Sequence, residues 1–349
     1  MDFKPHFNTL TRCLVERGDF SKTPFYLIDV GCGGGLPKIW DGFQNALAGV
    51  GIDPQVSECH RLQEQETRPN FRYVPRFLRL PRDHWFRQQR GEREPWTGNP
   101  WERTSAAQAM HILAEKTRQE DQFKVLNAWS GQALVEPTTT STLDELVEDQ
   151  LLPDVDFIKI DVDGPDFEVL LSAEKTIRDK PVLGLALEVN FSGTADPTDN
   201  TFHNIDRCLR SWGFDLFELS TRRCTMAALP ATFRFDEAPH ETDYGRVLQG
   251  DALYLRDPVG WEKVPENSVA LSPTKLLKLC CLFELFSMPD HAAELIRDRN
   301  TELEQVVETL PLLHLLAHQS APHLRNYHEH VNGFRDDPAS FYPSRRPQS

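Results

Sequence analysis

Long apolar stretches are missing from this 349-residue chain, and so is any excess of basic charge. No uninterrupted apolar run approaches the roughly 20 residues that a membrane-spanning helix needs. The opening residues, MDFKPHFNTL, lack the apolar core of an export signal. The net charge of -15 disfavours nucleic acid, whose binding depends on basic side chains that displace counterions. We therefore expect a cytoplasmic protein that neither spans a membrane nor binds nucleic acid.

Cysteine pairs at metal-binding spacing are absent as well. The seven cysteines are scattered without a CxxC motif, which argues against a structural zinc site and favours reduced thiols. One arginine-rich stretch departs from the acidic background, and we interpret it either as a solvated face or as a surface that meets an anionic substrate. Its members are Arg72, Arg76, Arg79, Arg82, Arg87, Arg90 and Arg93.

Short apolar runs alternate with segments of helical spacing, and this alternation predicts a parallel sheet with crossover helices. The expected strands are 26–30, 50–53, 71–74, 155–161, 182–189, 214–220 and 252–256. Several of these runs are apolar throughout, as strands buried on both faces should be. We predict an α/β fold with a doubly wound, mostly parallel seven-stranded sheet, in which the last two strands form an antiparallel edge pair.

Composition divides the chain into three parts. Residues 1–258 are predicted to form the sheet domain, with an insertion at about 82–122 that is rich in Trp, Arg, Gly and Pro. Residues 259–333 are expected to form a C-terminal helical extension, and 334–349 a disordered tail. The aromatic groups of the insertion fit either a stacking platform for a sugar ring or simple lid packing. They are His84, Trp85, Trp96 and Trp101.

The C-terminal extension predicts two helices. Ser272 offers an N-cap ahead of Pro273, after which the sequence is apolar almost all round. A second helix is predicted to start at Asp290 and to run through Leu310. These helices are expected to pack either on their own sheet or on a second subunit in a homodimer.

A hydrophobic strand that runs directly into a glycine-rich turn is the strongest local feature, FYLIDVGCGGG over 25–35. Asp29, ahead of the glycines, favours the cofactor loop of methyltransferases over the glycine-rich loop of dinucleotide dehydrogenases. Asp53 ends the next strand, 22 residues beyond Gly31. It is expected to bind ribose hydroxyls or to cap the following helix.

A longer motif, VDFIKIDVDGPDFEVL over 155–170, resembles the signature of FkbM-type methyltransferases. The segments TLDEL at 142–146 and GDALYL at 250–255 are similar to two further segments of that family. The resemblance covers roughly 24–258. It implies a Rossmann-like methyltransferase fold, S-adenosylmethionine as cofactor, and a hydroxyl of a sugar, glycan or related metabolite as the methyl acceptor. Two alternatives stay open: a non-catalytic cofactor-binding or scaffold protein on the same fold, and an NAD-linked oxidoreductase.

The resemblance and the strand ends together suggest site residues. The expected cofactor-binding residues are Asp29, Gly31, Cys32, Gly33, Gly34, Asp53 and Asp161. The candidates for removing a proton from the acceptor are Asp161, Asp163, His203 and His240. By analogy with metal-dependent O-methyltransferases, Asp161, Glu188 and Asn190 are expected to hold Mg²⁺. The alternative is that Asp161 positions the cofactor or caps a helix while Glu188 pairs with an arginine.

Overall fold

The computed structural model describes the sheet and the helices packed around it. The described residues are 8–90, 139–150, 152–162, 165–191, 195–224, 244, 246–260, 269–320 and 326–337. Trp96, Trp101 and most of the predicted insertion lie outside them, as does 338–349, so the expectations for insertion and tail stay predictions. In this described part of the chain, no helix has the length and apolar character needed to cross a membrane.

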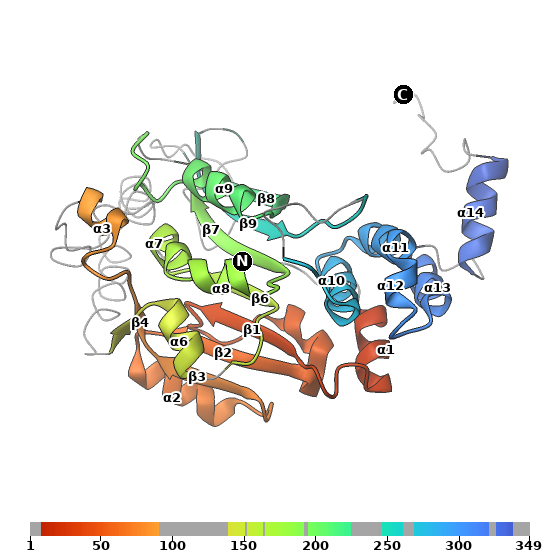
Figure 1. Cartoon of the computed structure of the whole chain (residues 1–349), viewed down its shortest axis with the longest axis horizontal. Coiled ribbons are helices and arrows are strands. Elements are labelled where there is room, and N and C mark those ends of the chain that lie inside the picture. The colour runs from red at the N-terminus through yellow and green to blue at the C-terminus, as the bar shows by residue number, and fades with distance from the viewer. Residues whose placement is uncertain are drawn as a thin grey trace, which may run out of the picture.

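A seven-stranded sheet forms the centre of the molecule (Figure 1). Its strands are Phe25–Val30 (β1), Leu47–Asp53 (β2), Phe71–Pro75 (β3), Phe157–Ile160 (β6), Gly184–Asn190 (β7), Asp215–Cys224 (β8) and Arg246–Leu255 (β9). Their order is β3-β2-β1-β6-β7-β9-β8, parallel as far as β7, with β9 antiparallel to both of its neighbours. Phe77–Leu78 (β4) and Thr140–Ser141 (β5) form a separate two-stranded sheet. The predicted fold class is confirmed, and the predicted antiparallel pair is β8 with β9.

Helices cover both faces of this sheet. Their bounds are Thr9–Arg17 (α1), Lys38–Ala46 (η1, a 3-10 helix), Val56–Gln65 (α2), Trp85–Arg90 (α3), Leu143–Asp149 (α6), Asp166–Leu171 (α7), Glu174–Asp179 (α8), Phe202–Ser211 (α9), Pro273–Leu285 (α10), Pro289–Asp298 (α11), Asn300–Leu303 (α12), Thr309–Ser320 (α13) and Tyr327–Asp336 (α14). One face shares a core with α6 to α9, and the other with α1, η1 and α10 to α13. Leu27 and Ile28 point to opposite faces and are both fully buried, which explains the uninterrupted apolar runs.

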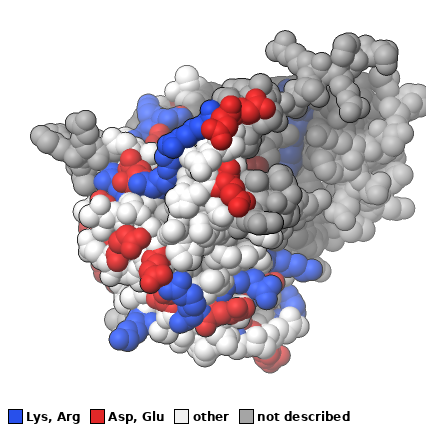
Figure 2. All heavy atoms as spheres, turned by 90° about the vertical axis from the view of Figure 1, so that its right-hand side faces the viewer, with Lys and Arg blue, Asp and Glu red and all other residues white. Residues whose placement is uncertain are grey.

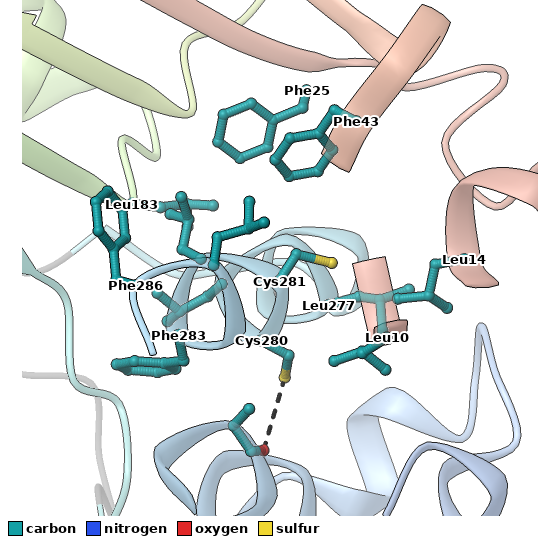
Figure 3. Packing of buried hydrophobic residues seen from close by; sticks show 14 of the residues in the cluster. Leu10, Leu14, Phe25, Phe43, Leu183, Leu277, Cys280, Cys281, Phe283 and Phe286 are labelled. Atoms are coloured by element: carbon teal, nitrogen blue, oxygen red, sulfur yellow. Dashed lines mark hydrogen bonds between the residues drawn. The ribbon is translucent and has the colours of Figure 1, made fainter. Parts of the chain in front are cut away.

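The C-terminal helices pack on the sheet of their own chain. Ser272 caps α10 by accepting a hydrogen bond from the Lys275 amide, and Pro273 occupies the first turn as predicted. Figure 3 shows residues of α10 between those of α1 and those near the sheet, with Cys280 donating a weak hydrogen bond to the Ala292 carbonyl. The extension therefore shares one hydrophobic core with the sheet.

The predicted second helix from Asp290 to Leu310 is wrong, because the chain breaks it twice. The helix α11 ends at Asp298 and α12 at Leu303, and α13 begins at Thr309. Thr309 donates from its amide and its hydroxyl to the Glu304 carboxylate, which fixes the turn before α13. Leu310, read as part of the apolar stripe, is 41% exposed. The helix α14, which we did not predict, has no buried residue and contacts α13 at the edge of the helical extension, where the His314 and His328 rings meet (Figure 1).

The face over the C-terminal helices carries charges of both signs. Figure 2 shows acidic and basic side chains interspersed there among the described residues. Phe334 on α14 is 47% exposed and belongs to neither of the two buried core clusters. The homodimer stays a prediction.

Candidate active site at the carboxyl edge of the sheet

The glycine-rich turn after β1 is fixed by the neighbouring strand. The amides of Gly31 and Cys32 both donate to the Ile52 carbonyl, at 2.8 and 3.2 Å. Gly31 has a φ of 75°, and a Cβ there would lie 1.8 Å from the Asp161 carbonyl oxygen. Gly31 is therefore needed so that the ends of β1 and β6 can approach each other.

Gly34 is the glycine of this turn that faces open space. Its φ is 83°, yet a Cβ built on it meets no described atom within 4 Å. Its amide donates to the Glu58 carboxylate of α2 at 3.0 Å. Arg61 pairs with Glu58 and holds the pKa of that carboxyl at about 2. Sequence reasoning missed Glu58, which ties the turn to the following helix.

Asp53 lies beside the turn at the end of β2. One oxygen accepts the Gln55 amide at 2.8 Å, and the other lies 3.5 Å from the position of a Cβ on Gly33. Burial raises the pKa of Asp53, while hydrogen bonds from the Gln55 and Gly33 amides oppose the shift. The N-cap of α2 is Gln55, so Asp53 precedes the helix rather than capping it at that position.

Cys32 contributes its backbone to the turn rather than its side chain. The side chain is 1% exposed, and its sulfur lies 3.1 Å from the position of a Cβ on Gly51. A hydrogen bond with the Cys59 thiol, together with burial, raises the pKa of Cys32. A neutral, packed thiol here serves the core and leaves the amide for the turn.

Lys159 joins three groups at the carboxyl edge, and sequence reasoning missed it. Its Nζ donates to the Gly31 carbonyl at 2.9 Å and lies 3.2 Å from Asp29 Oδ1 and 3.6 Å from Asp161 Oδ2. Burial would lower the pKa of Lys159, but the two carboxylates outweigh it and raise the pKa. Its position in the sequence could have revealed this role, because a lysine inside a buried strand needs a negatively charged partner.

Asp29, which is almost fully buried, faces this ammonium group. Burial raises its pKa to about 6, against the opposing effect of Lys159. Asp161 is more accessible, with 24% of its side chain exposed. The structure thus brings Asp29, Gly31 and Asp161 together around Lys159.

The other predicted proton acceptors are less well placed or lie outside the described residues. His203 occupies the first turn of α9 with an exposed side chain, and within the described chain no hydrogen bond or ion pair joins it to Asp161. Asp163 and His240 fall outside the described residues.

Residues 102–216 match the sequence model of the methyltransferase FkbM domain. The matched range includes Lys159 and Asp161, but it includes neither the glycine turn nor Asp53. The chain carries an FkbM methyltransferase domain. It is therefore an S-adenosylmethionine-dependent methyltransferase. No curated protein matches the chain at a significant level. Among solved structures, a crystal structure of cofactor-bound Rv0187 from MTB aligns at 11% identity over 70% of this chain and 78% of that one. Its TM-score of 0.29 supports no conclusion about fold or function.

Glu188, on the β7 strand of the FkbM domain, pairs with an arginine. Arg222 lies 3.2 Å from Glu188 and 3.2 Å from Asp251, and Gln249 donates a short hydrogen bond to Glu188. Burial would lower the pKa of Arg222, but Asp251 and Glu188 raise it. A guanidinium group already balances the carboxylate that was predicted to bind Mg²⁺. The Mg²⁺ site of Asp161, Glu188 and Asn190 therefore fits this arrangement poorly.

The described residues hold no metal cluster of another composition. Among the described residues, no group of three or more His, Cys, Asp or Glu side chains is placed to hold a metal ion. Asn190 lies outside those residue types, so the Mg²⁺ assignment stays a prediction.

The family segment TLDEL of the FkbM domain has a structural role. Thr142 and Glu145 form a reciprocal capping box at the start of α6, and Asp144 accepts the Lys175 and Thr176 amides of α8. A cavity of about 730 Å³ opens beside these helices, with Asp144 and Lys175 in its wall. His84 of the predicted insertion is among its described lining residues, but none of the predicted cofactor-binding, proton-accepting or Mg²⁺-binding residues is, so the cavity is separate from the glycine turn.

Proposed function

We propose that the protein is an O-methyltransferase that methylates a hydroxyl group of a sugar, glycan or related metabolite. The observation that carries the proposal is the convergence of the glycine turn, Asp53 and the partly exposed Asp161 at one edge of the sheet. Ligands of open α/β sheets bind at this edge, where the strand order reverses. The methyltransferase class is independent of this geometry, since it comes from the FkbM match.

The turn and its neighbours fit S-adenosylmethionine. The open space over Gly34 admits a ligand close to the backbone of Gly31 to Gly34, and the second Asp53 oxygen can accept a ribose hydroxyl. Asp29 and Asp161 would lie on the β1 and β6 side of the bound cofactor. S-adenosylmethionine supplies an electrophilic methyl group on a sulfonium sulfur.

Asp161 is the best-placed residue to take the proton of an acceptor hydroxyl. Its carboxylate is accessible, and the Lys159 ammonium group at 3.6 Å fixes its position. A base must lie within hydrogen-bond reach of the proton it removes, and the end of β6 borders both the turn and β7. Asp163 and His203 remain further candidates. No step is assigned to Mg²⁺, because Glu188, the carboxylate predicted to bind the ion, pairs with Arg222.

The test is transfer of a labelled methyl group from S-adenosylmethionine to a set of sugars and simple alcohols. We expect an alkali-stable ether product, activity that survives EDTA, and a fall of about 100-fold or more in kcat for Asp161→Asn. Glu148→Gln, an exposed residue of α6, is the matched control and should retain full activity. Transfer only to nitrogen or sulfur acceptors would refute the proposal, and full activity of Asp161→Asn would refute the assigned base.

A further inference from the structure

Six polar side chains share one face of the sheet beyond Asp161. In the antiparallel register Glu188 lies opposite Asp251, and Asn190 opposite Gln249. The next pairing adds Ser220 opposite Asp251 and Arg222 opposite Gln249. Directly opposed residues, and residues two apart on one strand, project from the same face. We call this set the polar platform: Glu188, Asn190, Ser220, Arg222, Gln249 and Asp251.

The platform continues the face that carries Lys159. Lys159 is aligned with Ala186 in the parallel pair of β6 and β7, and Ala186 is two residues before Glu188. Asp161, two residues after Lys159, is therefore in line with Glu188. The negative charge of Asp161 also contributes to the raised pKa of Arg222. The platform thus lies next to the candidate base.

Both carboxylates of the platform pair with one guanidinium group, but the hydrogen bonding of the platform is incomplete. Arg222 bridges Glu188 and Asp251 at 3.2 Å each, and the Ser220 hydroxyl donates to Asp251 Oδ2 at 3.3 Å. Among the described residues, nothing donates a hydrogen bond to Asn190 Oδ1 or Asp251 Oδ1. These residues are only 5% and 8% exposed, and buried oxygens without a donor are costly. Two acceptor oxygens therefore lack donors within the described part of the chain and can accept hydrogen bonds from a ligand.

The missing donors belong to neutral groups rather than to a cation. A divalent ion beside Asn190 would sit next to the Arg222 guanidinium, which already pairs with both carboxylates and would repel the ion. Hydroxyl groups donate hydrogen bonds without adding charge. Asn190 and Asp251 are diagonal neighbours across the strand pair, about 7 Å apart, a span that two hydroxyls of one sugar-sized ring can bridge. Ser220 is exposed and Arg222 is partly exposed, so the platform is open to solvent on the β8 side.

We propose that the polar platform binds the methyl acceptor, and that this acceptor is a neutral polyhydroxylated ring whose hydroxyls donate to Asn190 Oδ1 and Asp251 Oδ1. The inference rests on the proposed function, because it places the acceptor next to Asp161. It specifies the residues and the chemistry that select the substrate. Arg222 serves to hold the two acidic side chains in place rather than to bind an anion.

The experiment uses the full chain saturated with S-adenosylhomocysteine and a set of methyl hexopyranosides that differ in hydroxyl orientation. Binding is measured by saturation-transfer NMR and calorimetry. We expect at least one methyl hexopyranoside to bind, and Asn190→Leu and Asp251→Asn each to weaken that binding about tenfold or more. Asn190→Asp keeps the acceptor oxygen and should keep binding. Thr221→Val, on the opposite face of β8, is the matched control and should behave as the wild type.

The outcomes separate this inference from the proposed function. If the wild type binds S-adenosylhomocysteine but no pyranoside, or if Asn190→Leu binds pyranoside as well as the wild type, the platform assignment is overturned. If Mg²⁺ alone binds in a calorimetric titration and Asn190→Leu abolishes that binding, the platform is a metal site instead. Failure of the wild type to bind S-adenosylhomocysteine refutes the proposed cofactor site. Unchanged S-adenosylhomocysteine affinity in the variants shows that they are folded.

Discussion

The two ends of β6 carry buried charge clusters of opposite composition. At the amino end, the Asp156 carboxylate receives hydrogen bonds from two lysines of α10, Lys275 at 2.6 Å and Lys278 at 2.7 Å. At the carboxyl end, one lysine, Lys159, faces two carboxylates, Asp29 and Asp161. Asp156 therefore lies between two cations, of which Lys275 also pairs with Asp154, whereas Lys159 lies between two carboxylates.

The two clusters differ in how many of their carboxylate oxygens accept hydrogen bonds. Asp156 also accepts the Tyr26 amide at 2.7 Å, so both of its oxygens are hydrogen-bonded, and the cluster attaches α10 to the sheet. Asp29 lies near Lys159, but among the described residues neither of its oxygens has a hydrogen bond of good geometry. Asp161 is partly exposed. The amino end is thus built for stability, and the carboxyl end retains charge for binding and chemistry.

The largest effect should come from the amino end. Asp156→Ala leaves the buried Lys278 without a carboxylate and Lys275 with Asp154 alone, and should lower the free energy of unfolding by about 3–5 kcal/mol. Urea unfolding followed by circular dichroism measures this change. Lys175→Met removes the exposed pair with Glu148 and should leave the midpoint unchanged. Equal midpoints for Asp156→Ala and the wild type would contradict the stabilising role of this cluster.

A pH-dependent effect should appear at the carboxyl end. The pKa of Asp29 is about 6 in the fold, above its usual value of 3.8, so its contribution to stability is present below pH 4 and is lost as the pH rises through 6. Asp29→Asn removes this titration. Relative to the wild type, it should gain about 3 kcal/mol between pH 4 and pH 7 in urea unfolding. Parallel pH profiles for the two proteins would show that Asp29 titrates normally.

A smaller stability loss, coupled to function, should follow from Lys159→Met. The variant leaves Asp29 facing a methyl group, but Asp29 can take up a proton, so we expect a loss of about 2 kcal/mol rather than the full cost of a broken buried pair. The loss should be larger at pH 8 than at pH 5. S-adenosylhomocysteine affinity should fall too, because Lys159 holds the Gly31 carbonyl. A stability loss that does not depend on pH, together with unchanged S-adenosylhomocysteine affinity, would show that Lys159 contributes only to packing.

Local sequence patterns predicted the strands and the glycine turn, because each of these elements depends on a short run of consecutive residues. The apolar run of β1 and the glycines after it placed Gly31 and Gly34, and the end of β2 placed Asp53. The break before α13 was missed, since Leu303 and Leu310 keep helical spacing while Thr309 donates hydrogen bonds to Glu304 at the start of a new helix. Spacing cannot reveal a hydrogen bond that competes with continued helix.

The charge clusters could not be predicted, because their partners are distant in sequence. Asp156 and Lys278 are 122 positions apart, and Arg222 and Asp251 are 29 apart. Strand alternation correctly placed Glu188 and Asn190 on one face, but only the register of β7, β9 and β8 brings Arg222 to Glu188. The sequence therefore left Mg²⁺ and an arginine open as partners of Glu188, and the fold supplies the arginine.

The central claim is that the glycine turn and Asp53 hold the methyl donor at the carboxyl edge of the sheet. Calorimetric titration of S-adenosylhomocysteine into the wild type and Asp53→Ala tests it most directly, with the exposed Glu148→Ala as the control. The account predicts one binding site in the wild type and in the control, and a 10- to 100-fold weaker affinity, about 1.5–3 kcal/mol, in Asp53→Ala. Equal affinities in all three proteins, or no binding by the wild type, would contradict it.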